Sequence, residues 1–131
     1  MKQEKLFWAI IIFLLCAMIF YLTSSSQGSF MGTEHIFHSY NYYARNMAHV
    51  SVFGLLAVAV QRILNINKFS YLLAWIFVTT YGASDEWHQM FLLNRTPLWS
   101  DVVLDSTGAF LALVIVYLWF HFKNNRKNEL R

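Results

Sequence analysis

The chain has 131 residues, of which 57% are hydrophobic and only 13% are charged, with a formal net charge of +3. A typical soluble domain carries about 25% charged residues, and a chain of this size cannot bury so much apolar surface by itself. The composition therefore excludes an ordinary soluble domain and indicates a single membrane domain over residues 1–131. The single cysteine, Cys16, excludes an internal disulfide and a cysteine-based metal cage.

Four apolar segments follow one another along the chain, at about 6–22, 46–64, 69–90 and 101–122. Crossing a bilayer as a helix takes roughly 20 residues at about 1.5 Å each. The sequence therefore predicts an all-α protein, a bundle of four transmembrane helices. The first segment has an alternative interpretation as a secretory signal, but its apolar core is longer than that of a usual signal, which favours an uncleaved anchor. The aromatic segment 28–44 is expected to be a loop that is partly re-entrant or lies on the membrane.

The basic residues predict the orientation of the bundle. Eight of the ten fall on one side of it: Lys2, Lys5, Arg62, Lys68, Lys123, Arg126, Lys127 and Arg131. By the positive-inside rule, this side faces the cytoplasm and holds both termini. The basic residues are too dispersed for a nucleic-acid surface, so the expected partners are membrane lipids.

Most of the acidic residues and histidines gather at the opposite, outer side, and their spacing turns them toward the bundle. At about 100° per residue, Asp85, Glu86 and Gln89 share one arc of a helix, with His88 at its edge. Trp87 points nearly opposite, and an indole suits the lipid headgroup region. The three polar side chains are therefore expected to face the neighbouring helices.

The second and fourth segments repeat this pattern. Arg45 and His49 stack one helical turn apart, and so do Asp101 and Asp105. Small residues extend the acidic faces and predict close helix packing there: Gly82, Gly108 and Ala112. The short loop 91–100 is expected to hold Arg95 above the acidic residues.

Two sequence stretches carry a family resemblance. "RNMAHVSVFGLL" at 45–56 and "YGASDEWHQMFLLNRTPLWSDVVLDSTGAF" at 81–110 resemble the VanZ-like family of small bacterial membrane proteins. That family has an Arg and a His opening one helix, D-E-x-x-Q closing the next, and then an Arg loop and D-x-x-x-[DN]-x-x-G. The resemblance implies a multi-pass protein of the bacterial plasma membrane. It also implies an association with low-level resistance to teicoplanin, a lipid-tailed glycopeptide that acts outside the membrane.

The polar residues predict a pocket that opens to the outer leaflet and binds or modifies a lipid-linked envelope precursor or an amphiphilic antibiotic. Asp85, Glu86 and His49 are the candidate catalytic residues for a general acid–base step. The candidate binding residues are Arg45, Gln89, Arg95, Asp101 and Asp105. A divalent cation stays open as an alternative, held by Glu86, Asp101, Asp105 and His49.

Two other function classes remain open. In a non-catalytic scaffold, the charged residues would form an ion-pair network that only stabilises the helix ends. In a proton-coupled transporter, the acidic residues and histidines would relay protons. We expect the cytoplasmic halves of the helices to be apolar, so a transport path would require an oligomer. His35 and His38 have H-x-x-H spacing, but without the glutamate of a zinc protease helix they are interpreted as loop or interfacial residues.

Overall fold

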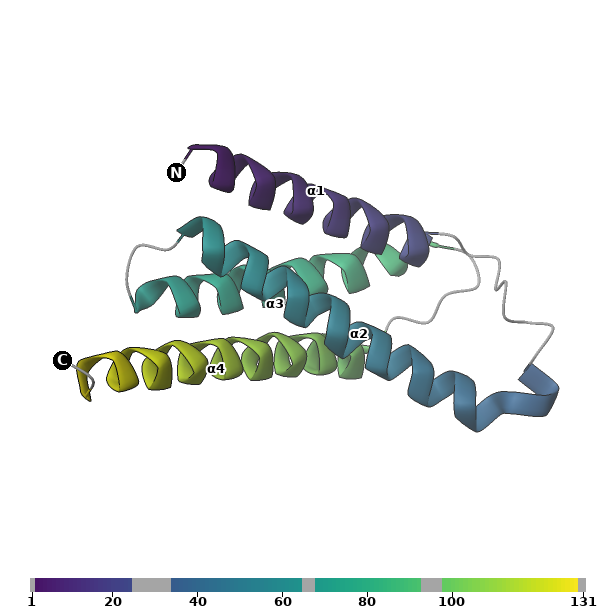
Figure 1. Cartoon of the computed structure of the whole chain (residues 1–131). Coiled ribbons are helices and arrows are strands. Elements are labelled where there is room, and N and C mark those ends of the chain that lie inside the picture. Colours follow the sequence, from purple (N-terminus) through teal and green to yellow (C-terminus); the bar gives the residue numbers. More distant parts are fainter. Residues whose placement is uncertain (1, 25–33, 65–67, 93–97, 130–131) are drawn as a thin grey trace.

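The computed structural model describes residues 2–24, 34–64, 68–92 and 98–129, except for the side chains at 2, 22, 34–45 and 129. Four helices account for nearly all of these residues (Figure 1): α1 Lys2–Ser24, α2 Glu34–Leu64, α3 Phe69–Gln89 and α4 Trp99–Glu129. The described residues contain no strand, which confirms the prediction of an all-α fold.

Three of the predicted helix boundaries are wrong. α1 begins at Lys2 rather than near residue 6. α2 begins at Glu34 rather than near residue 46, so the part of the expected aromatic loop from residue 34 onward is helical. α4 continues to Glu129 rather than ending near residue 122. A predicted membrane span ends at the first charged residue because lipid excludes charge. A helix does not have to end there, because its backbone hydrogen bonds form regardless of side-chain charge.

Three helices form the centre of the bundle and the fourth is attached to one side of it. α2, α3 and α4 each pack on the other two, whereas α1 packs on α2 and more lightly on α3. The start of α1 and the end of α4 lie at the same end of the molecule (Figure 1). The ends of α1 and α3 and the start of α4 lie at the opposite end, so helices distant in sequence bring their polar residues together there.

The apolar core is thin, and small residues let the helices approach closely. Leu56, Ala57, Ala74, Val78 and Ala109 are fully buried. α2 and α4 approach closely, and a Cβ placed on Gly108 would lie 2.5 Å from the Val50 carbonyl oxygen. Only glycine fits at this crossing, as is typical where membrane helices pack through small residues.

Large apolar side chains cover much of the outside of the bundle, as expected where lipid rather than water is the solvent. Examples are Phe13, Leu55, Phe91, Ile115 and Trp119, each more than half exposed. Within the described part of the chain, three stretches are long and apolar enough to cross a membrane: Gln3–Tyr21, Asn46–Leu64 and Trp99–Asn128. α3 is a helix over the predicted range but is not among these stretches, because its last turns carry the polar residues described below.

Candidate functional site

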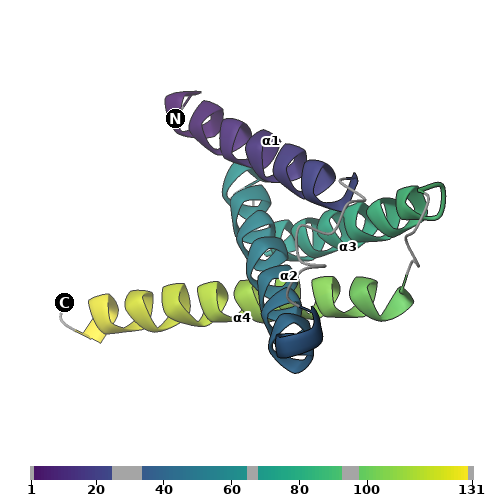
Figure 2. The ribbon, with the colours of Figure 1, turned by 90° about the vertical axis from the view of Figure 1, so that its right-hand side faces the viewer.

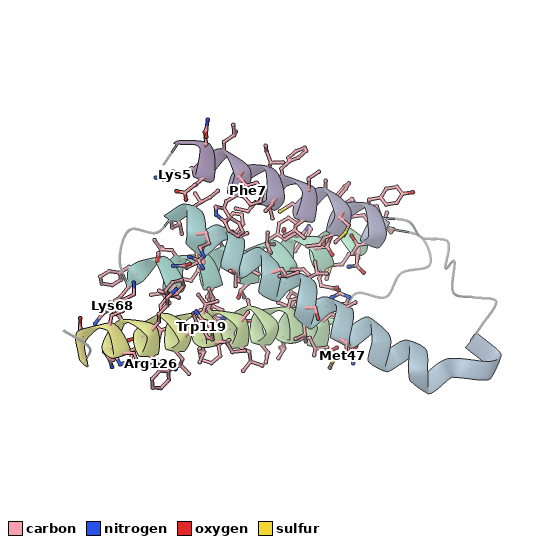
Figure 3. The ribbon with its side chains drawn as sticks, viewed as in Figure 1. Lys5, Phe7, Met47, Lys68, Trp119 and Arg126 are labelled. Atoms are coloured by element: carbon pink, nitrogen blue, oxygen red, sulfur yellow. The ribbon has the colours of Figure 1, made fainter. Side chains whose placement is uncertain are left out.

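Side chains from all four helices meet at the end of the bundle opposite the chain termini. We call this group the polar cluster; it comprises Thr23 of α1, His49 of α2, Asp85, Glu86 and Gln89 of α3, and Asp101 and Asp105 of α4. Figure 3 shows the basic residues Lys5, Lys68 and Arg126 at the other end, far from Met47, which is among the first residues of α2 with a described side chain.

The last turns of α3 present their polar side chains inward. Asp85, Glu86 and Gln89 are 6%, 4% and 5% exposed, whereas Trp87 between them is 61% exposed. This confirms the prediction that Asp85, Glu86 and Gln89 face the neighbouring helices and that Trp87 faces away from them. A carboxylate taken out of water needs hydrogen-bond donors or a counter-charge, so the partners of these groups decide what the cluster can do.

Gln89 holds the two adjacent carboxylates of α3 together. Its Nε2 donates to Asp85 Oδ2 at 3.1 Å and to Glu86 Oε1 at 3.0 Å. The amide nitrogen carries two hydrogens, so one bond to each carboxylate uses its full donor capacity. The side chain lies three and four residues from its partners, which is the spacing that puts them on one helix face.

Glu86 also ties α3 to the segment that leads into α4. The backbone N–H of Leu98 donates to Glu86 Oε2 at 2.9 Å. Leu98 immediately precedes α4, so this bond fixes where that helix begins relative to the acidic end of α3. Both oxygens of the Glu86 carboxylate therefore accept a hydrogen bond.

Thr23 connects α1 to the cluster. Its hydroxyl lies 2.8 Å from Asp85 Oδ1, 2.9 Å from the Ile19 carbonyl and 3.2 Å from the Phe20 carbonyl. A hydroxyl has a single hydrogen, and the carboxylate is the nearest and strongest of the three acceptors. The bond to Asp85 joins residues 62 positions apart and fixes the end of the outermost helix.

His49 and Asp105 form the contact between α2 and α4. The His49 Nδ1 lies 2.9 Å from Asp105 Oδ1, and the imidazole stacks on Phe53 with ring planes 3° apart. Asp105 is 2% exposed and also lies against Gly82 of α3. An ionised aspartate at this distance favours the tautomer with hydrogen on Nδ1 and orients the ring. A proton-transfer role for His49 would use this geometry.

His88 lies at the seam between α1 and α3 rather than among the carboxylates. Its Nε2 is 3.4 Å from the Ser24 hydroxyl, and its ring is 4.9 Å from that of Phe20. Its position at the edge of the polar arc agrees with this placement.

The family model VanZ/LLP1 matches residues 7–120, which include every member of the polar cluster. The chain belongs to the VanZ/LLP1 family. This confirms the resemblance inferred from the Arg-His, D-E-x-x-Q and D-x-x-x-D-x-x-G patterns. No curated protein and no solved structure gives a match to this chain.

The remaining predicted site residues of this VanZ/LLP1 protein either lie at the edge of the polar cluster or have side chains that the structure does not describe. Asp101 is buried at its edge, 8% exposed. Arg45 lies on α2 one turn before His49, but its side chain is outside the described residues, as is the whole of Arg95. The predicted role of the two arginines stays a prediction. His35 and His38 lie in the first turns of α2, and their side chains are likewise not described.

The sequence interpretation missed two members of the hydrogen-bond network. Thr23 was not a candidate because a lone threonine near the end of an apolar helix is common, although it is the last residue before a run of serines. The Leu98 N–H carries no sequence signal, because every residue except proline has such a group. Only the folded arrangement shows that these two donors face Asp85 and Glu86.

The divalent-cation alternative gains no support from the geometry. Within the described part of the chain, no three His, Cys, Asp or Glu side chains are grouped so that they could hold a metal ion. The carboxylates of Asp85, Glu86 and Asp105 are oriented instead toward donors from the protein.

The other half of the bundle is not apolar throughout, which corrects an expectation from the sequence. Gln61 and Ser70 are buried there, 5% and 1% exposed. The Gln61 Oε1 has no hydrogen-bond partner in the described part of the chain, and the same is true of the buried Nε of Arg62. The Arg62 guanidinium carbon lies 4.7 Å from the centre of the Phe120 ring. The absence of polar residues in this half therefore no longer argues against transport.

Proposed function

We propose that this VanZ/LLP1 protein binds an amphiphilic, lipid-linked component of the cell envelope at the polar cluster, and that the cluster faces the outer side of the bacterial plasma membrane. The observation that carries the proposal is the meeting of Asp85, Glu86 and Asp105 with donors from α1, α2, α3 and the segment that leads into α4, all at one end of the bundle. Ionisable groups within membrane helices are costly and usually serve a function.

The chemistry of the cluster suggests which molecules suit it. Oriented carboxylates accept hydrogen bonds from hydroxyl, amide and ammonium groups, all of which occur in sugar–peptide headgroups. The arginines predicted beside the cluster, Arg45 and Arg95, suit a phosphate or carboxylate. The exposed apolar flanks of α1 and α4 suit an acyl or prenyl tail in the surrounding lipid. Binding at this place would alter sensitivity to lipophilic glycopeptides of the teicoplanin type.

The 2.9 Å pair of His49 and Asp105 favours one second candidate, in which the bound molecule is chemically modified. A histidine oriented by a carboxylate is a suitable general base or acid, and Asp85 and Glu86 would then position the substrate or share the proton transfer. Binding alone requires only the shape and hydrogen bonds of the cluster. A change in the lipid extract of cells that overproduce the protein would distinguish modification from binding.

The test uses full-length variants in a glycopeptide-susceptible bacterial host, with the amount of protein in the membrane measured for each. We expect Asp85→Asn, Glu86→Gln and His49→Ala to lose the teicoplanin phenotype of the unmodified protein. Glu4→Gln, at the opposite end of α1, is the matched control and should keep it. Full resistance from all three cluster variants at normal protein levels would refute the proposal. A parallel loss of thermal stability and phenotype would favour the scaffold instead.

A further inference from the structure

The last three turns of α4 extend beyond most of the bundle, and only their first turn is in contact with other helices among the described residues, through Tyr117 with Tyr71 and Phe120 with Arg62. Every residue from Tyr117 to Asn128 is exposed. Figure 2 shows this end of α4 projecting away from the other helices. The helix remains regular to Glu129, although its apolar run ends at Phe122.

One face of this extension combines aromatic and basic side chains. A hollow of about 470 Å³ is lined by Trp119, Phe122, Lys123, Arg126 and Lys127. At about 100° per residue, these five side chains lie within an arc of about 140°. The stretch from Trp119 to Asn128 contains no Asp or Glu, so the positive charge of this face is not neutralised from within it.

The order of the side chains along the helix matches the layers of a membrane surface. Trp119 and Phe122 come first, next to the apolar run, and the basic residues follow over roughly one further turn. At about 1.5 Å per residue, Arg126 lies about 10 Å further along the axis than Trp119, which is comparable to the step from the acyl region to the phosphates. Aromatic rings are thus placed for the interface and cations for the headgroups.

We propose that this face of α4 binds the headgroup of an anionic phospholipid in the leaflet at the termini end of the bundle. The positive charge complements the phosphate, Arg126 can form a two-bond contact with it, and the aromatic side chains contact the upper acyl chain. This site lies at the opposite end of the bundle from the polar cluster, so it does not depend on the proposed function.

The positive-inside rule by itself also places basic residues at this end of the bundle. The test must therefore distinguish a lipid-binding site on α4 from a general attraction between anionic lipid and all the basic residues at this end. Lys5 and Lys68 provide the matched control, because both are exposed cations at the same end (Figure 3). Two double variants are compared, and each removes two positive charges. One combines Arg126→Gln with Lys127→Gln, and the other combines Lys5→Gln with Lys68→Gln. All four positions are exposed, so neither pair should disturb folding.

The experiment measures the Kd of the full-length protein in neutral detergent micelles for short-chain phosphatidylglycerol and phosphatidylcholine. We expect the unmodified protein to prefer the anionic lipid, and the α4 pair to reduce that preference by about 25-fold, given about fivefold for each of the two basic residues. The Lys5 and Lys68 pair does not line this hollow, so we expect only a screened, long-range effect of less than about twofold from removing it. Equal losses in the two pairs, or no preference at all, would overturn the proposal.

Competition with inorganic phosphate at matched ionic strength shows whether the site binds a lipid headgroup or any free phosphate. We expect it to compete poorly, because the aromatic half of the face has nothing to contact in a free ion. Displacement of the lipid by phosphate as readily as by phosphatidylglycerol would overturn the assignment to a lipid. Trp119→Ala should weaken the binding of both lipids without changing their ratio. An unchanged affinity in that variant would contradict the aromatic contact.

Discussion

The carboxylate of Asp105 lies directly over Gly82, so that a Cβ placed on Gly82 would be 3.1 Å from Asp105 Oδ2. Because Gly82 of α3 has no side chain, the Asp105 carboxylate of α4 has room to reach His49 of α2. Three helices are fixed relative to one another at this point. The cluster depends on helix packing as much as on its own polar residues.

Gly82→Ala is expected to destabilise the bundle by about 1–3 kcal/mol, because the new methyl group meets Asp105 and the Phe53 ring. Gly108→Ala should cost more, because its methyl group would meet backbone atoms of Val50, which cannot move aside without separating α2 from α4. Denaturant titration in mixed micelles measures both variants. Gly82→Ala being the more damaging of the two would contradict the described packing.

His49 and Asp105 are expected to be energetically coupled. In a double-mutant cycle of His49→Ala and Asp105→Ala, we expect an interaction energy of about 1 kcal/mol, because each single variant leaves the other side chain without its 2.9 Å partner. The cycle is measured by the free energy of unfolding. Strictly additive effects would mean that this contact does not stabilise the bundle.

Thr23→Val is expected to lower the free energy of unfolding by about 0.5–2 kcal/mol, because Asp85 loses the hydrogen bond from α1 while the volume of the side chain is kept. Thr23→Ser retains the hydroxyl and should restore most of the loss. Thr80→Val is the matched control, since the exposed Thr80 hydroxyl bonds within its own helix, to the Ile76 carbonyl. A similar loss in both valine variants would assign the effect to valine itself.

Gln61→Leu is expected to leave stability unchanged or to raise it by about 1 kcal/mol, because the buried Oε1 has no partner in the described part of the chain. Thermal unfolding of the purified protein checks this. Marked destabilisation would mean that Gln61 has a bonding partner in the membrane. A stable variant that loses the phenotype would instead support a polar path through this half of the bundle, as transport requires.

The orientation is testable by reporter fusions at two positions. A reporter that is active only in the cytoplasm is expected to work when fused to the C-terminus. A reporter that is active only after export is expected to work when fused shortly after α3. The first result would place the basic ends of the helices inside, and the second would show that α3 crosses the membrane. A C-terminus on the outer side would refute the assignment of the polar cluster to the outer leaflet.

Much of the architecture could be predicted from the sequence because it depends on local patterns. The apolar runs gave the number of helices, and the spacing of Asp85, Glu86 and Gln89 relative to Trp87 gave the inward face of α3. Helical periodicity and the solvent preference of side chains are enough for such predictions. The extra turns of α2 and α4 were missed because the apolar run marks the membrane rather than the helix.

Which groups meet was decided only by the tertiary structure. The sequence determined that carboxylates, histidine and glutamine share one end of the bundle, because charge bias and periodicity are properties of each segment. It did not determine that Thr23 would bond Asp85, that the Leu98 N–H would bond Glu86, or that His49 would select Asp105 among the acidic residues. Such pairings depend on the rotation and offset of packed helices, which glycines such as Gly82 and Gly108 set through contacts between segments distant in the chain.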